Sequence, residues 1–254
     1  METKLNYKRT FLIGLAFLSI CSFWQMYDNI IPLILQNTYH LGETMTGAVM
    51  ALDNVLAIFL LPVFGTLSDK VHTKLGRRMP FIVSGTILAV IFMMLLPMID
   101  NAEKARWGTV ESFSNQVIFL AVLFFTLVSM GLYRSPAVAL MPDVTPNHLR
   151  SRANAVINLM GAVGGVYALI MIKVLVGKGE TPDYLPLFAS IAAVMAIAVG
   201  ILVMTIRENK LREEVEKAEA AIAETIEEKA MAEGVEAVGE IEAVGDTGAG
   251  KASD

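Results

Sequence analysis

Residues 65–82 read GTLSDKVHTKLGRRMPFI and form a short, basic segment between two long apolar stretches. The stretch before it covers residues 44–65, and the stretch after it covers residues 79–99. A helix rises 1.5 Å per residue, so about 20 apolar residues cross a hydrocarbon core of roughly 30 Å. The segment therefore predicts a tight polar connection between two membrane-spanning helices.

The composition of the whole chain agrees with a membrane protein. Hydrophobic residues make up 55% of its 254 residues and charged residues only 18%, whereas about 25% of the residues in a soluble domain are charged. The single cysteine, Cys21, excludes an internal disulfide and a cysteine-based metal site. We therefore expect a membrane protein without a metal centre or an organic cofactor.

Four further apolar stretches flank this pair and complete a set of six. Each backbone polar group in a bilayer must be paired within the protein, and the alternating pattern of a membrane barrel is missing, so we expect helices. The predicted fold class is all-α, a polytopic membrane protein with six transmembrane helices. The predicted spans are residues 11–35, 44–65, 79–99, 116–141, 153–176 and 185–206.

Basic residues gather in every second connection between these spans. Short cytoplasmic loops retain Lys and Arg, so we expect these connections and both termini to be cytoplasmic, in the plasma membrane. Residues 1–10 would form a cytoplasmic amino terminus. Residues 207–254 would form an acidic cytoplasmic tail that is partly helical and then disordered, because a segment rich in Ala, Glu and Gly cannot bury a core.

The segment 65–82 resembles the signature loop of the major facilitator superfamily of transporters. In that pattern a Gly allows close helix packing, an Asp follows four residues later, and a Gly with two basic residues opens the next helix. A second stretch, RSPAVALMPDVTPNHLRSRANA at residues 134–155, is similar to sucrose-type carriers, a group related to the glycoside-pentoside-hexuronide cation symporters. The resemblance covers residues 11–206 and implies the amino-terminal six-helix half of a sugar carrier.

The resemblance also implies a conformational gate on the cytoplasmic side. Asp69, Arg77, Arg78 and Asp143 look like a charge cluster that locks the two halves of a carrier in the outward-facing state. Positive-inside topology alone would explain the basic residues but not the acidic Asp69 among them. The residues assigned to this gate are Gly65, Asp69, Gly76, Arg77, Arg78, Asp143 and Arg152.

Ionisable residues within the spans are candidates for the transport site, because charge at membrane depth is costly without a cavity or a partner. Asp28 and Asp53 reach similar depths when residues are counted from the ends of their spans. Arg134, in the fourth span, must find a carboxylate or water for its permanent charge. The predicted substrate-binding or proton-coupling residues are Asp28, Asp53, Arg134, Trp24, Gln25, Tyr27 and Asn54.

These observations lead to a hypothesis of secondary active transport of a sugar, such as a disaccharide or glycoside, by alternating access. The coupling ion is expected to be a proton, since Ala57 and Leu61 stand where the related cation symporters carry paired Asp residues. The expected partners are the bilayer, the sugar, and a second six-helix half or a homodimer partner. The alternatives are a multidrug-type efflux carrier of the same superfamily and a truncated, non-transporting interaction protein. The spans contain no nucleophile–base pair or nucleotide loop, so we do not expect an enzyme or a nucleic-acid partner.

Overall fold

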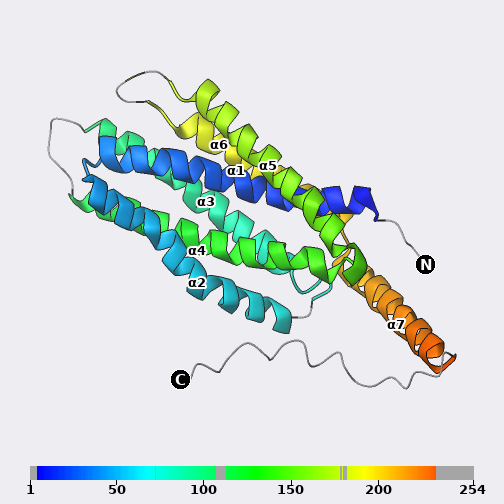
Figure 1. Cartoon of the computed structure of the whole chain (residues 1–254). Coiled ribbons are helices and arrows are strands. Elements are labelled where there is room, and N and C mark those ends of the chain that lie inside the picture. The colour runs from blue at the N-terminus through cyan, green and yellow to red at the C-terminus, as the bar shows by residue number, and fades with distance from the viewer. Residues whose placement is uncertain (1–4, 72, 107–112, 178, 180–181, 233–254) are drawn as a thin grey trace, which may run out of the picture. The chain divides into compact units, whose positions relative to one another are not determined.

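The computed structural model describes residues 5–71, 73–106, 113–177, 179 and 182–232; the predictions for residues 1–4 and 233–254 lie outside this set. Nearly all described residues are helical (Figure 1), which confirms the all-α fold class. Six helices are long and apolar enough to cross a membrane. They are α1 Tyr7–Asn37, α2 Glu43–Lys70, α3 Met79–Lys104, α4 Phe113–Asp143, α5 Arg150–Leu175 and α6 Leu185–Thr205.

Two further helices lie at connections. The short 3-10 helix η1, Asn147–Leu149, precedes α5, and α7, Glu208–Ala232, follows α6. We call the end of the bundle where α2 ends and α3 begins the basic end, because Lys70, Lys74, Arg77 and Arg78 lie there. At 1.5 Å per residue, helices of 21 to 31 residues are about 30 to 45 Å long, enough to cross a bilayer.

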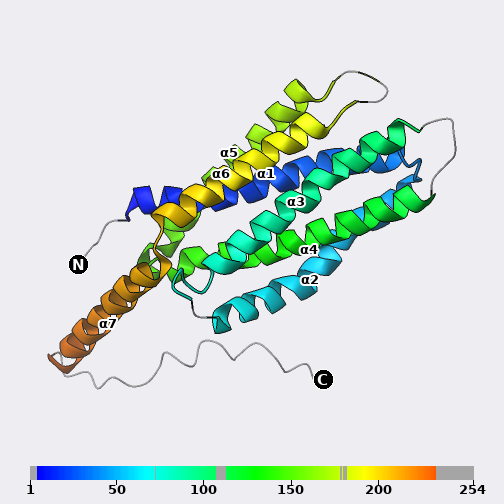
Figure 2. The ribbon, with the colours of Figure 1, turned by 180° about the vertical axis from the view of Figure 1, so that it is seen from behind.

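Helix α1 is the helix around which the bundle is built. It packs mainly against α5 and α6, whereas α3 packs against α4 and α6, and α2 packs mainly against α4. Figures 1 and 2 show α2 and α5 at opposite edges of the bundle. Large side chains such as Phe23, Tyr27 and Tyr133 are almost completely buried in the core between these helices.

Small residues allow α1 and α5 to approach closely. Ser22 on α1 donates a hydrogen bond of 2.9 Å to the carbonyl oxygen of Gly164 on α5. A Cβ atom at Gly164 would collide with the carbonyl oxygen of Leu18, and one at Gly161 would lie 2.9 Å from the Cys21 sulfur. Glycine is therefore required where the two helices touch, as is common between helices in membranes.

The outer surface of the bundle is apolar. Ile58 and Phe59 on α2, Val174 on α5 and Met204 on α6 are all exposed. Helix α2 buries only Thr46 and Ser68, although its sequence is strongly apolar. Such a surface is unsuited to water and suited to lipid or to other apolar helices. The chain is an integral membrane protein.

The structure differs from the sequence expectation at the start of the tail. The compact part of the chain extends to Val215, and the segment from Glu216 onward forms a separate unit. Glu208, Leu211 and Val215 are buried rather than solvated. Leu211 and Val215 lie four residues apart, so they share one face of α7, and this face packs onto the bundle.

Candidate functional site

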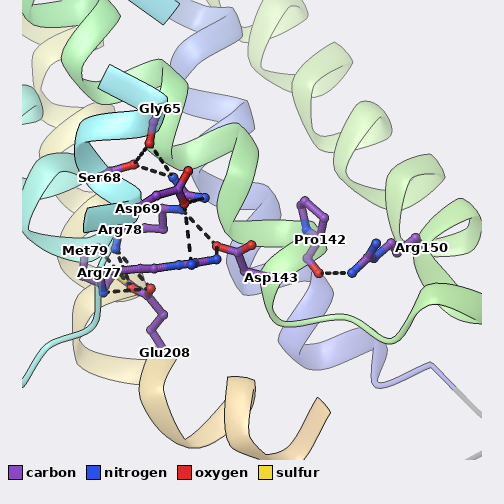
Figure 3. Close-up of polar contacts among 10 residues, drawn as sticks. All are labelled: Gly65, Ser68, Asp69, Arg77, Arg78, Met79, Pro142, Asp143, Arg150 and Glu208. Atoms are coloured by element: carbon purple, nitrogen blue, oxygen red, sulfur yellow. Dashed lines mark hydrogen bonds and ion pairs between the residues drawn. The ribbon is translucent and has the colours of Figure 1, made fainter. Parts of the chain in front are cut away.

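The residues assigned to the gate, except Arg152, come together at the basic end, where α2 ends, α3 begins and α4 ends (Figure 3). Arg78 pairs with two carboxylates at once: its guanidinium lies 2.5 Å from the Asp69 carboxylate and 2.9 Å from that of Asp143. Arg77 lies 2.9 Å from Asp143 and 3.6 Å from Asp69. Two arginines and two aspartates thus form one network that joins three helix ends.

Arg78 is the most buried member of this network. Only 5% of the residue is exposed, and its guanidinium also donates to the carbonyl oxygen of Gly65 at 3.1 Å and to the hydroxyl of Ser68. A buried charge is tolerated when charge-assisted hydrogen bonds satisfy it, as they do here. Removal of one partner would leave an uncompensated charge, so the network holds the three helix ends together as a unit.

The two predicted gate glycines, Gly76 in the connecting loop and Gly65 in α2, both lie in close contacts. Gly76 has φ +124°, a conformation that L residues with a side chain rarely adopt. A Cβ atom at Gly76 would in addition collide with the Glu208 carboxylate. A Cβ atom at Gly65 would lie 3.3 Å from the Ser135 hydroxyl of α4, so Gly65 allows the close approach of α2 and α4.

Glu208, which the sequence analysis placed in the tail, is part of this site. It is fully buried, and its carboxylate accepts hydrogen bonds from the backbone N–H groups of Arg77 (2.9 Å), Arg78 (3.0 Å) and Met79 (3.1 Å). The first N–H groups of a helix have no partner within the helix and carry partial positive charge. Glu208 therefore caps α3 from a segment about 130 residues away along the chain, a pairing that no local sequence pattern indicates.

The structure places Arg152 apart from these residues. Arg152 is exposed on α5, whereas Arg150 donates to the carbonyl oxygens of Pro142 (2.9 Å) and Thr145 (3.2 Å). Figure 3 shows Arg150 beside the end of α4. Among the basic residues that begin α5, it is Arg150 that holds the α4–α5 connection.

Three of the predicted transport residues line a small cavity between α1, α2 and α4. Trp24, Asp53 and Arg134 line it together with Leu56, Ala57, Leu60, Leu61, Leu127 and Gly131. Its volume is about 20 Å³, room for roughly one water molecule, whereas small-molecule sites usually have about 300 Å³ or more. Along α2 the lining runs from Asp53 to Leu61, a distance of about 12 Å. The cavity is too small to enclose a small-molecule ligand, and we call its lining the wall.

Arg134 lies against Trp24 in this wall, and Trp24 in turn contacts the buried Tyr27. The Arg134 guanidinium lies 5.4 Å from the centre of the Trp24 ring, within the range of a cation–π interaction. The Trp24 ring is in edge-to-face contact with Tyr27 at 5.4 Å. The indole N–H of Trp24 and the hydroxyl of Tyr27 are buried without a hydrogen-bond partner among the described residues. Such groups usually find a partner, so they are candidates for ligand contact.

The remaining predicted residues lie at the edge of the same region. Asn54 donates a hydrogen bond of 3.0 Å to the carboxylate of Asp53. Asp28 is exposed, Gln25 is half-buried, and Asp28 and Asp53 lie close enough to interact electrostatically. Asp28 is about 14 Å from the end of α1 at Asn37, well within the depth of a bilayer. A carboxylate at this depth on the bundle surface needs water or a polar partner rather than lipid.

A second polar cluster lies at the end opposite the basic end. The carboxylate of Asp100, fully buried, accepts from Lys104 at 2.6 Å and from the Thr38 hydroxyl at 2.7 Å. Lys104 also donates to the carbonyl oxygen of Pro182 at 2.6 Å. Hydrogen bonds from Asn101 and from the backbone of Leu185 lower the pKa of the neighbouring Asp183. Sequence reasoning missed this cluster, which ties together the ends of α1, α3 and the α5–α6 connection.

Comparison with known proteins supports the resemblance. Residues 13–238 match the family described as the Major Facilitator Superfamily. The sucrose transport protein SUT3 of Oryza sativa subsp. japonica is 26% identical over 137 residues, which are 51% of this chain and 27% of that protein. The sucrose transport protein SUC4 of Arabidopsis thaliana is 34% identical over 116 residues, 43% of this chain and 22% of that protein.

A bacterial protein gives a similar match. The uncharacterized symporter sll1374 of Synechocystis is 24% identical over 144 residues, which are 55% of this chain and 25% of that protein. The aligned stretches thus cover only about a quarter of the length of these relatives.

Proposed function

Because this chain belongs to the Major Facilitator Superfamily, whose members are transporters rather than enzymes, we propose that its six helices form one half of a secondary active sugar carrier. The substrate class is a small sugar such as a disaccharide or glycoside. Transport is coupled to a proton, and the six helices rock against a second set of six around a site near the middle of the bilayer.

The observation that carries this proposal is the polar wall that α1, α2 and α4 present at membrane depth. Asp28 and Asp53 supply hydrogen-bond acceptors for hydroxyl groups, and the Trp24 ring supplies a flat apolar surface for a sugar ring. The unpartnered N–H of Trp24 and hydroxyl of Tyr27 add two donors. A second wall is needed to enclose the substrate, since the cavity in this bundle has only about 20 Å³.

Proton coupling is assigned to the carboxylates of this wall. Asp53 is half-buried, shares the cavity with Arg134 and accepts a hydrogen bond from Asn54. Protonation would remove a negative charge from a site that also holds the permanent positive charge of Arg134. The occupancy of the substrate site and the protonation of Asp53 would then depend on one another, as symport requires.

The network at the basic end is proposed as the gate of this cycle. It joins α2, α3 and α4 when Arg77 and Arg78 pair with Asp69 and Asp143. In the proposed orientation this end and both termini lie on the cytoplasmic side of the plasma membrane. The second set of helices is supplied by a separate six-helix half or by a second copy of this chain.

The test is uptake of labelled disaccharides into vesicles that contain the full chain alone or together with a supplied second six-helix half, with and without a proton gradient. We expect saturable, gradient-driven uptake that Asp53→Asn abolishes. The matched control is Glu43→Gln, which removes an exposed carboxylate in the first turn of α2, outside the wall, and should leave uptake within about twofold of wild type. Uptake unchanged by Asp53→Asn would contradict the assigned coupling.

A binding measurement tests the substrate site without requiring a complete transport cycle. Trp24 and Trp107 are the two tryptophans, so in a Trp107→Phe background the fluorescence of Trp24 reports ligands at the wall. We expect disaccharides to change this fluorescence, and Arg134→Gln to weaken the effect about tenfold or more. Absence of any change with a range of sugars would argue against a sugar site.

One observation favours efflux of amphipathic compounds as a second candidate function. The cavity is lined mostly by apolar side chains, among them Leu56, Leu60, Leu61 and Leu127. Such a lining suits an apolar ligand that carries one charge. Quenching of Trp24 by lipophilic cations, with no response to sugars, would favour this function.

A further inference from the structure

The outer face of α3 and α6 carries an apolar groove of about 430 Å³. The helices lie side by side there, as Figure 2 shows. Its lining is apolar except for Thr86, whose hydroxyl bonds to the carbonyl oxygen of Ile82 at 2.7 Å. The space exists because α6 contributes small residues, Ala196 and Gly200, opposite Val83, Ile87 and Ile91 of α3.

The groove lies at the depth of one leaflet. Its lining covers residues 83–91 of α3 and residues 196–204 of α6, a length of about 12 Å at 1.5 Å per residue. It begins at the basic end, because Met204 is next to the end of α6 at Thr205. Half of a hydrocarbon core of roughly 30 Å is about 15 Å, so the groove matches the acyl region of a single leaflet.

A second pocket of about 440 Å³ continues the groove at the basic end. The two share Val203 and Met204, and the pocket adds the basic residues Lys74, Arg207 and Lys210. All three are exposed, and no ion pair joins them to a carboxylate among the residues that the structure describes. The pocket also contains Glu208, but the N–H groups at the start of α3 compensate the charge of this carboxylate.

We propose that this groove and pocket together bind one anionic phospholipid of the leaflet at the basic end. An acyl chain lies between α3 and α6, and the phosphate group lies among Lys74, Arg207 and Lys210. An apolar groove that opens into a basic pocket complements a lipid with an apolar chain and a negative headgroup. The site lies on helices that do not line the proposed transport cavity, so the proposed lipid binding can be tested independently of the proposed sugar transport.

The test is native mass spectrometry of the delipidated full chain titrated with dioleoylphosphatidylglycerol or with dioleoylphosphatidylcholine, two lipids with the same chains but different headgroup charge. We expect tighter binding of phosphatidylglycerol by tenfold or more. Lys74→Gln/Lys210→Gln should weaken this binding about fivefold per residue, whereas Lys74→Arg/Lys210→Arg should restore it. The control Lys8→Gln/Lys173→Gln removes two exposed charges elsewhere and should leave the preference unchanged.

A second variant tests the groove. Gly200 lines the groove, and no atom lies within 4 Å of a Cβ atom added there, so Gly200→Leu is the variant chosen to fill the groove. We expect at least fivefold weaker binding of phosphatidylglycerol, and no change for Gly47→Leu, whose added Cβ atom on α2 also meets no atom within 4 Å.

Several outcomes would overturn the proposal. They are equal binding of the two lipids, binding unaffected by the glutamine variants or by Gly200→Leu, and full competition by inorganic phosphate, which would identify a site for free anions. A change in oligomeric state with Gly200→Leu would instead assign the groove to a second copy of the chain.

Discussion

Glu208 illustrates how a single side chain positions the gate. Its carboxylate bonds to the backbone of Arg77, Arg78 and Met79, so it orients the turn from which both gate arginines project. Gly76 lies against the same carboxylate, and a Cβ atom added there would collide with the Glu208 side chain. The two residues, far apart in sequence, fix one backbone conformation.

At this scale we predict that Glu208→Ala destabilises the start of α3. The substitution leaves three buried or partly buried N–H groups without their acceptor, which costs about 1–3 kcal/mol. Hydrogen exchange followed by mass spectrometry should show faster exchange in residues 76–82. Thermal unfolding of the variant should give a lower melting temperature than that of wild type. Glu214→Ala is the control, since Glu214 forms an exposed ion pair with Arg9 and such pairs contribute little. Equal protection of residues 76–82 in wild type and Glu208→Ala would refute the capping role.

At the scale of elements, the contact between α1 and α5 depends on glycine. Lipid provides no hydrophobic drive for helices to associate, so close packing and hydrogen bonds must hold them together. Ser22 donates across the contact to the Gly164 carbonyl, and the Cys21 sulfur lies where Gly161 leaves room. This contact holds α5 against α1, the helix that carries Trp24, Tyr27 and Asp28.

We predict that Gly164→Ala disrupts this contact, because the added Cβ atom would collide with the backbone of Leu18. Backbone cannot move aside as a flexible side chain can, so a loss of about 2 kcal/mol or more is expected. In Gly165→Ala the added Cβ atom has an ordinary contact of 3.7 Å with Gln25, and alanine favours the helix by up to about 1 kcal/mol. Melting temperatures in one detergent should therefore fall for the first variant only, and a fall of equal size in both would contradict the argument.

At the scale of the whole bundle, polar networks close both ends of an apolar set of helices. Asp69, Arg77, Arg78 and Asp143 join α2, α3 and α4 at the basic end. Asp100 and Lys104 join the ends of α1 and α3 to the α5–α6 connection at the other end. Between them the helices touch through apolar and small residues and through single hydrogen bonds such as that from Ser22 to Gly164, so the ion pairs that a rearrangement would have to break lie at the ends.

We predict that Arg78→Ala loosens the basic end as a unit. Breaking a buried ion pair leaves its partners uncompensated and typically costs about 3–5 kcal/mol. Hydrogen exchange should increase together in residues 65–70 and 140–145, which lie on different helices. Arg152→Ala, which removes an exposed arginine from α5, should leave both segments as protected as in wild type. An increase confined to the α2–α3 loop would show that the network does not couple the helix ends.

The sequence by itself determined the six helices, because lipid requires backbone groups to be paired within each apolar segment, and this requirement is local. The resemblance to a known transporter family indicated that Asp69, Arg77, Arg78 and Asp143 form one cluster, and the structure brings these four side chains together. The spans Phe113–Asp143 and Tyr7–Asn37 extend beyond the predicted residues, since helices continue into polar turns that hydropathy does not detect.

Only the tertiary structure decided which residues meet between distant segments. Glu208 caps α3, Arg150 rather than Arg152 holds the end of α4, Arg134 lies over Trp24, and Asp100 is buried with Lys104. These pairings depend on how each helix is rotated about its axis and on where the helices cross. Hydropathy and charge along the chain say how deep a residue lies, but not which neighbour it faces, because that is set by the packing of the helices against one another.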